Sequence, residues 1–423
     1  MAFPLLLVCI ALLFNRPGDW VPALAGLPLF QSAIIACLSL SIGQFLSRLQ
    51  ATSAVRTPVS VCVNGLLAVV ILSALVNGSP LEVVTNFAKS WVLYFLVLAL
   101  VDSPRRLRIA LIGTAVSILG IALLIVLDHH TGMFGGISSI ETEEGLRTEA
   151  IGGAMFDSND TAALLVVAVL IFVATTIDSR SKILRCLCIV FAIISLDAIQ
   201  LCNSRSSLLA LLAGIGVYIY LRWGSKGLKW GAILLPIVVV FVATDRMTDI
   251  SALQRGTGQS RMQFWSIGLS LLVRNPILGI GPDEFVSIVG KACHNSFVQA
   301  FAELGVFGGA MFVGAFYLSI TCSMQLARTV SSSDGEKSAA YPTVLIIPSV
   351  LVAYSTSLMT LNHLYGCHTY LLLATSAVAS SVYGFSESEE SRNVGSNLIG
   401  RLGKVACIFL AVTYVGCLVF VQW

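Results

Sequence analysis

Residues 111–127 read LIGTAVSILGIALLIVL, a run without a single charged side chain. As an α-helix such a run crosses the apolar core of a bilayer, which is about 30 Å thick, because a helix rises about 1.5 Å per residue. The strands of a membrane barrel would alternate apolar and polar residues, whereas this run is apolar on almost every face. The run therefore predicts a membrane-spanning helix.

Similar runs recur along the whole chain of 423 residues, which is 57% hydrophobic and only 11% charged. Soluble domains carry about 25% charged residues, so a soluble protein is excluded, and no basic cluster indicates a nucleic-acid partner. The predicted spans cover residues 2–14, 24–46, 57–76, 82–101, 107–127, 161–177, 184–200, 206–221, 229–243, 296–325, 342–361, 368–384 and 405–421. We therefore predict an all-α fold, a polytopic membrane bundle of about 12 to 13 transmembrane helices.

The connections between these spans differ in charge. When the spans are threaded alternately, one side collects most of the basic connections. They carry Arg48 and Arg56; Arg105, Arg106 and Arg108; Arg180, Lys182 and Arg185; Arg222, Lys226 and Lys229; Arg328 and Lys337; and Arg392, Arg401 and Lys404. Because positively charged loops stay in the cytoplasm, this side is predicted to be cytoplasmic.

Two long loops, residues 128–160 and 244–295, fall on the opposite side. Long loops are uncommon and often carry function, so we expect catalysis or substrate capture there. Within the second loop, residues 261–272 place Phe264, Trp265 and other apolar residues on one helical face, which is typical of an amphipathic helix lying in the membrane interface. Asn275-Pro276 is predicted to end that helix.

A histidine stands at the outer mouth of span 296–325. His294 and Asn295 precede the apolar run, and Ser296 followed by Gln299 matches a capping box, which predicts a helix start at Asn295 or Ser296. An imidazole can take a proton from a hydroxyl near neutral pH, so His294 is the predicted general base. The alternative is a histidine that only makes hydrogen bonds at the interface.

Glycines follow deeper in the same span. In a continuous helix, eleven residues at about 100° each return to nearly the same face, so Gly305 would lie below His294, about three turns deeper. Gly305 and Gly308 would then form a flat face for close helix packing or for a lipid chain.

Four basic residues are predicted near the outer surface, where such residues are depleted. Arg147, Arg205 and Arg261 carry guanidinium groups suited to bidentate binding of phosphate oxygens. Lys89 lies inside a span, where a charge is costly, so it either pairs with Glu82 or binds phosphate. Each arginine could instead be a solvated loop residue or contact a lipid headgroup. The three guanidinium groups together could hold a diphosphate.

A metal site is the rival to this arrangement. Asp157-Ser158-Asn159-Asp160 offers two carboxylates to Mg²⁺ or Mn²⁺, but Asp160 directly precedes an apolar run and fits a helix cap equally well. The 11 cysteines show no zinc spacing, and neither glycine-rich nucleotide motif occurs. We therefore expect no metal and no cofactor, so that the donor itself supplies the energy for any reaction.

Several blocks of sequence resemble one family. His294-Asn295, nine residues and Gly305-x-x-Gly308 resemble the signature H[NSQ]X9GXX[GTY] of the O-antigen ligase (Wzy_C) superfamily of bacterial envelope glycosyltransferases. Ser204-Arg205-Ser206-Ser207-Leu208 resembles the family's Ser-Arg-Gly/Ser segment. The remaining similar blocks are Arg261 through Trp265 to Asn275-Pro276-Ile277-Leu278-Gly279-Ile280-Gly281, and Arg147 with Gly152, Phe156 and Asn159. The resemblance covers roughly residues 145–325.

The resemblance implies a GT-C-like helical membrane fold in the bacterial inner membrane, with the active site at the periplasmic surface. The implied donor is a glycan on undecaprenyl diphosphate, and the acceptor is a hydroxyl of the lipid A-core oligosaccharide. His294 matches the presumed base, while Arg147 and Arg261 match arginines thought to engage the diphosphate. The further predicted substrate-binding residues are Arg205, Lys89, Asn295, Asn159, Gly305 and Gly308. Transfer is expected to be metal-independent and inverting.

Three segments follow from this interpretation: N-terminal helices over 1–127, a catalytic core over 128–325 and C-terminal helices over 326–423. The same blocks also occur in polysaccharide polymerases, so an O-antigen or exopolysaccharide polymerase, with the growing glycan as acceptor, is the alternative. A transporter of lipid-linked glycans is a rival of another class, although paired interrupted helices in two repeat halves are not evident.

Overall fold

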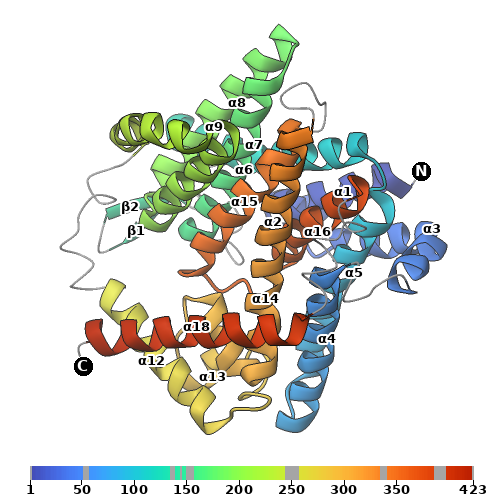
Figure 1. The fold of residues 1–423 in the computed structure, drawn as a ribbon, viewed down its shortest axis with the longest axis vertical. Coiled ribbons are helices and arrows are strands. Elements are labelled where there is room, and N and C mark those ends of the chain that lie inside the picture. Colours follow the sequence, from blue (N-terminus) through green and yellow to red (C-terminus); the bar gives the residue numbers. More distant parts are fainter. Residues whose placement is uncertain are drawn as a thin grey trace. The chain divides into compact units, whose positions relative to one another are not determined.

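The computed structural model describes residues 2–50, 57–133, 139–142, 145–148, 157–242, 257–333, 341–384 and 397–421. Nearly all of these residues are helical, and one short hairpin of two strands interrupts the pattern (Figure 1). The helices are α1 (Ala2–Asn15), α2 (Pro17–Trp20), η1 (Pro22–Leu24), α3 (Leu29–Gln50), α4 (Pro58–Asn77), α5 (Leu81–Leu100), α6 (Pro104–Thr131), α7 (Ser158–Asp178), α8 (Lys182–Cys202), α9 (Arg205–Val242), α12 (Thr257–Arg274), α13 (Phe285–Val289), α14 (Ser296–Ser333), α15 (Tyr341–Leu358), α16 (Cys367–Val382) and α18 (Leu398–Phe420). The strands are β1 (Ser139–Thr142) and β2 (Gly145–Thr148).

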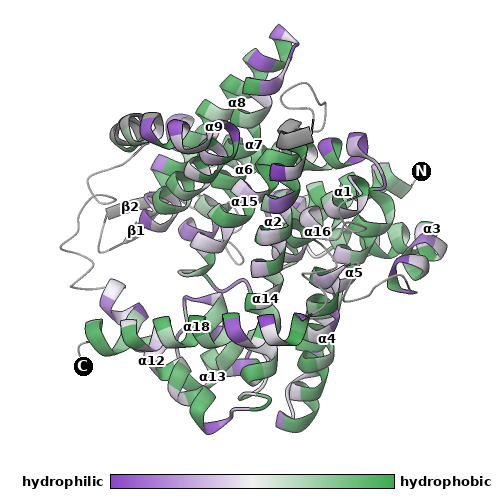
Figure 2. Ribbon diagram, viewed as in Figure 1, coloured by the Kyte–Doolittle hydropathy of each residue, from purple (hydrophilic) through white to green (hydrophobic). Residues whose placement is uncertain are grey.

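The predicted polytopic helical fold is confirmed. In the part of the chain that the structure describes, nine helices are long and apolar enough to span a membrane, and three more apolar helices are shorter. Figure 2 shows α4 and α8 hydrophobic over most of their length. Every predicted span contains a helix, and α9 covers two of them. The span predicted over 24–46 instead begins at Leu29, because the segment before it forms the short helix η1 and a turn at Gly26 with a φ of 77°.

The helices form two compact units. Unit 1 comprises Met1–Ser41, Leu100–Thr248 and Ser323–Ser357, and unit 2 comprises Ile42–Ala99, Asp249–Cys322 and Leu358–Trp423. Each unit draws on all three of the segments that the sequence predicts, so the division at residues 127 and 325 stays a functional prediction.

In unit 1, α7 lies beside α6, α8 and α9 (Figure 1). At the beginning of α7, Ser204 Oγ, just before α9, donates to Asn159 Oδ1 at 2.9 Å. At the end of α7, Arg222 of α9 pairs with Asp178. α7 and α9 therefore run in the same direction, and α8, which connects them in the chain, runs in the opposite direction.

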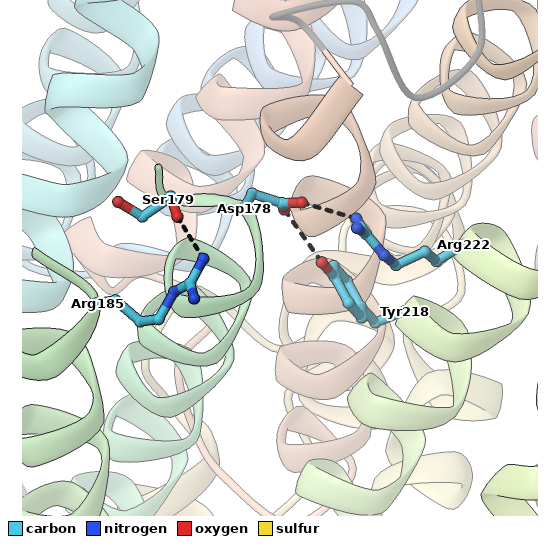
Figure 3. A network of polar contacts seen from close by, with 5 residues as sticks. All are labelled: Asp178, Ser179, Arg185, Tyr218 and Arg222. Atoms are coloured by element: carbon cyan, nitrogen blue, oxygen red, sulfur yellow. Dashed lines mark hydrogen bonds and ion pairs between the residues drawn. The ribbon is translucent and has the colours of Figure 1, made fainter. Parts of the chain in front are cut away.

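The end of α7 is held by a polar cluster that Figure 3 shows from close by. Arg222 Nη1 lies 2.8 Å from Asp178 Oδ1, and Tyr218 Oη donates to Asp178 Oδ2 at 3.2 Å. Arg185 of α8 donates to the carbonyl of Ser179 at 2.8 Å. These residues lie beside Arg180 and Lys182, so this is the end of unit 1 that the charge distribution predicts to be cytoplasmic.

Unit 2 is packed around apolar side chains of α12, α13 and α14. Phe285, Cys293, Val298 and Ala302 form a buried cluster, against which Phe264, Trp265, Leu271, Ile280, Val289 and Phe409 pack. α18 lies against α12 (Figure 1). The helix predicted over 261–272 is therefore confirmed as α12, but its apolar face packs on protein, since a side chain added at Gly268 would lie 2.7 Å from Val298.

Candidate active site

The residues that the sequence predicts to form the site are divided between the units. Unit 2 contains Lys89, Arg261, His294, Asn295, Gly305 and Gly308, and unit 1 contains Arg147, Asn159 and Arg205.

His294 lies directly before α14 with a backbone φ of 51°. Few side chains tolerate this left-handed region, although histidine is one of those enriched there. The conformation is held from outside, because the N–H of His294 donates to Asn362 Oδ1 at 2.9 Å. The histidine itself is half-buried. A non-glycine residue fixed in a sparsely populated conformation is often part of a functional site.

Asn295 caps the helix. Its Oδ1 accepts hydrogen bonds from the N–H groups of Phe297 at 3.0 Å and Val298 at 3.2 Å, so the helix start predicted at Asn295 or Ser296 is confirmed. The capping box is wrong. Ser296 Oγ instead donates to the carbonyl of Leu361 at 2.7 Å, and Gln299 Nε2 reaches Glu303 at 3.1 Å. The Asn295 side chain is fully buried, and its role toward substrate stays a prediction.

α14 is broken at Gly305, which has a φ of 68° and a ψ of −166°. Gly305 therefore does not lie three turns below His294 on one continuous face, and that prediction is wrong. A Cβ at Gly305 would overlap the backbone carbonyl of Ile277, and one at Gly279 would overlap the backbone of Glu303. Both glycines are needed because two backbone segments touch at this point.

The segment that fills the break is Pro276–Gly281. The N–H groups of Ile280 and Gly281 donate to the carbonyls of Ala302 and Glu303 at 3.0 and 3.1 Å, and the N–H of Val306 donates to the carbonyl of Pro276 at 2.8 Å. The docked segment thus satisfies carbonyls where one helical piece ends and an N–H where the next begins. The glycines of both similar motifs therefore meet at one junction.

Side chains of α4 support the docked segment from the other side. Ser73 Oγ donates to the carbonyls of Leu278 at 2.7 Å and Glu303 at 3.2 Å, and Asn77 Nδ2 reaches the carbonyl of Gly279 at 3.4 Å. Gly308 is buried beneath Leu304, whose Cβ a side chain at Gly308 would overlap. The flat face predicted for Gly305 and Gly308 is thus interrupted at its first glycine.

The other two predicted residues of unit 2 lie on helices that contact the same region. Arg261 is one turn before Trp265, which packs on the cluster containing Cys293. Lys89 Nζ donates to Asn86 Oδ1 at 2.8 Å. No ion pair joins Lys89 to Glu82 among the described residues, so that alternative is wrong.

Two of the three predicted residues of unit 1, Asn159 and Arg205, lie at the same end of it. Arg205 begins α9, next to the Ser204–Asn159 hydrogen bond, and is half-buried. β2, which carries Arg147 opposite Ile140, lies beside α8. Gly152 and Phe156 lie outside the described residues.

Two acids of unit 1 have structural partners. Asp157, not Asp160, caps α7, with its Oδ1 accepting from the N–H groups of Asn159 at 2.7 Å and Asp160 at 2.9 Å. Asp197 of α8 contacts His130 at the end of α6, with 3.2 Å between Oδ2 and Nε2. This pair joins α8 to α6 near the outer end that the threading predicts.

The sequence interpretation missed two features of unit 2. One is the loop 359–366, in which Asn362 holds His294 and the N–H of His363 donates to Ser296 Oγ at 2.8 Å. The other is Glu303, fully buried in α14. A signal for Glu303 existed, because an acid inside a predicted span is costly and usually functional.

The described part of the site can support acid–base chemistry. It offers a half-buried imidazole at a helix mouth, on a backbone held in place by a neighbouring loop. An imidazole on such a held backbone, partly shielded from solvent, suits proton transfer, and the guanidinium group of Arg261 on α12 suits binding of an anionic group.

Residues 190–313 match a family model described as O-antigen ligase. The matched stretch includes Arg205, Arg261 and His294, and extends past the break at Gly305. No curated protein matches the chain. The resemblance seen in the sequence motifs is thereby confirmed: over this stretch the chain is similar to the O-antigen ligases, a family of the ligase or polymerase type of glycosyltransferase. The similar block around Arg147 lies outside the matched stretch.

Proposed function

We propose that the protein is an O-antigen ligase that transfers a glycan from undecaprenyl diphosphate to a hydroxyl of lipid A-core oligosaccharide on the periplasmic side of the inner membrane. The observation that carries the proposal is the conformation of His294 within the matched stretch: a left-handed backbone, held by Asn362, at the mouth of a membrane-spanning helix. An imidazole on a backbone held in this way fits the role of general base.

The proposed reaction is a single displacement. His294 takes the proton from the acceptor hydroxyl as its oxygen attacks the anomeric carbon of the donor sugar. The bond between that carbon and the diphosphate oxygen breaks, so the configuration inverts and undecaprenyl diphosphate leaves with the electron pair. Arg261, with Lys89 of the same unit, is proposed to bind the departing diphosphate, because fixed cationic donors stabilise charge as it develops. For Arg147 and Arg205 of unit 1, binding of the diphosphate stays a prediction from the resemblance.

The base assignment is tested with His294→Asn. Asparagine tolerates the left-handed backbone that residue 294 adopts but cannot act as the base. We expect transfer from a purified polyprenyl-diphosphate glycan to fall by about 10² to 10⁴-fold, the usual contribution of general acid–base catalysis. His129→Asn, at an exposed histidine of α6, is the matched control and should leave transfer unchanged. Near-normal transfer by folded His294→Asn would remove the base assignment.

The acceptor is tested separately by offering the donor with and without lipid A-core. Product that appears only with lipid A-core, identified by mass spectrometry, supports a ligase. Chain extension without lipid A-core would show a polymerase instead. Movement of the lipid-linked glycan across a vesicle membrane without a new glycosidic bond would show a transporter.

A further inference from the structure

Glu303 lies in α14 two residues before the break and is fully buried. Its carboxyl group accepts four hydrogen bonds. Oε2 accepts from the N–H of Asp283 at 3.0 Å and from Tyr365 Oη at 2.7 Å. Oε1 accepts from the N–H of Phe285 at 3.3 Å and from Gln299 Nε2 at 3.1 Å.

These partners are unusual for an acid in a membrane-spanning helix. Among the described residues no ion pair joins Glu303 to a cation, so neutral donors alone solvate its oxygens. A charge inside a membrane-spanning helix is costly, and such residues are usually functional. The acid therefore needs a reason other than stability, and its geometry supplies one.

The four donors come from three segments. Gln299 belongs to the first turns of α14, Asp283 and Phe285 follow the docked segment Pro276–Gly281, and Tyr365 belongs to the loop 359–366. Glu303 thus ties the chain after the docked segment and the loop 359–366 to the broken helix. The docked segment also fills the break in α14 at Gly305. The carboxyl group of Glu303 therefore holds both backbone segments that meet at this junction.

The loop that contains Tyr365 also holds the segment around His294. Asn362 Oδ1 accepts from the N–H of His294 at 2.9 Å, and Ser296 Oγ bonds the backbone of that loop on both sides of Asn362. The same loop is fixed to α5 by Ser90 Oγ, which donates to the carbonyl of Tyr365 at 2.7 Å. Short contacts therefore connect Glu303 to the backbone of His294 through this single loop.

We propose that Glu303 is a positioning residue, whose carboxylate holds Tyr365 and the loop 359–366 in the one arrangement that presents His294 to the acceptor hydroxyl. The inference rests on the proposed function, because that function gives the positioning of His294 its purpose. Glu303 is not proposed to touch substrate. Its effect on the reaction passes through Tyr365, Asn362 and the left-handed backbone of His294.

A carboxylate suits this role better than an amide of equal size. All four partners are hydrogen-bond donors, and burial together with the negative charge of Glu303 raises the pKa of Tyr365 well above its usual value, so the phenol keeps its proton. An amide would place its own N–H groups against two of those donors. Glu303→Gln therefore disturbs the junction with almost no change in volume.

The first test compares Glu303→Gln and Tyr365→Phe with wild type. We expect kcat for transfer to fall about 10- to 100-fold while KM for the donor stays within about threefold, because misplacement of a reacting group by about 1 Å costs on the order of 10²-fold. Tyr94→Phe, which removes another buried hydroxyl hydrogen-bonded to a side chain of unit 2, is the control and should change neither constant. Normal kcat in folded Tyr365→Phe would overturn the proposal, even if Glu303→Gln fails to fold.

The second test does not need the transfer reaction. Modification of His294 by diethyl pyrocarbonate, followed by peptide mass spectrometry, should change in rate by about threefold or more in Tyr365→Phe and Glu303→Gln, because loosening the loop alters access to the imidazole. His129 on α6 is the internal control. An unchanged rate at His294 in both variants would overturn the proposal. A changed rate in a protein that transfers no glycan would support the positioning and overturn the proposed function alone.

Discussion

α9 and α14 are both 38 residues long, and each is broken by one glycine in nearly the same conformation. Gly224 has φ 63° and ψ −153°, and Gly305 has φ 68° and ψ −166°. Their surroundings differ completely. A Cβ at Gly224 would meet nothing within 4 Å, whereas one at Gly305 would overlap the backbone of Ile277. The same backbone conformation is thus an open bend in unit 1 and a docking point in unit 2.

The two breaks are also stabilised differently. α9 is held just before Gly224 by side chains, since Tyr218 and Arg222 both bond Asp178 of α7. α14 is held at Gly305 by backbone hydrogen bonds with the segment Pro276–Gly281. Side chains can be exchanged at a measurable cost, but a backbone junction excludes every residue except glycine. Dependence on glycine should therefore be strongest where the proposed site lies.

The largest expected effect is that of Gly305→Ala. The glycine-only conformation adds about 1–3 kcal/mol of strain. Overlap of the new Cβ with the backbone of Ile277 adds about 1–3 kcal/mol more. The free energy of unfolding should therefore fall by about 2–6 kcal/mol in total, in the upper part of that range. We expect little folded protein in detergent, and no transfer by what remains.

Gly224→Ala is the matched control for this comparison. It introduces the same methyl group in the same conformation but meets open space, so only the strain of about 1–3 kcal/mol applies and transfer should persist. Apparent melting temperatures in one detergent measure both variants. If the melting temperature falls equally in the two variants, the docked segment does not make the break in α14 more sensitive to substitution than the break in α9.

The sequence predicted the helices far better than the breaks. Apolar runs such as 111–127 determine a span by length alone, and every predicted span contains a helix. Helical periodicity predicts one continuous face at Gly305, because it cannot show that a segment about 25 residues earlier returns to fill the break in the helix. The position of His294 at a helix mouth was predictable from the start of the apolar run. Its dependence on Asn362 was not, since that contact joins residues 68 apart.

A second effect should follow from Arg222→Leu, which removes one side of the ion pair that holds α9. The two side chains are only 13% and 7% exposed, so Asp178 would be left buried with Tyr218 alone. Breaking a buried pair from one side costs about 3–5 kcal/mol. Because the pair lies at the far end of α7, about 30 Å from Asn159, transfer per folded molecule should stay near wild type.

The control for Arg222→Leu is Arg106→Leu. Arg106 and Asp102 form a pair of similar length, but their side chains are 40% and 50% exposed, and exposed pairs contribute about 0–1 kcal/mol. Unfolding of both variants by the same denaturant series gives the comparison. A loss in Arg222→Leu no greater than that in Arg106→Leu would mean that side chains do not hold α9 in the manner described.

The smallest effect is expected for Ser73→Ala, which removes a support of the docked segment without touching either glycine. Ser73 Oγ donates to the carbonyl of Leu278 at 2.7 Å, and a lost hydrogen bond of this kind costs about 1 kcal/mol. Amide exchange should become faster at Ile280 and Gly281, because loosening the segment weakens their bonds to α14. Ser117→Ala, a buried serine that bonds only within its own helix at 2.7 Å, should leave that exchange unchanged. If the two serines behave alike, the segment is held by its backbone bonds alone, and the contrast between the two breaks becomes sharper still.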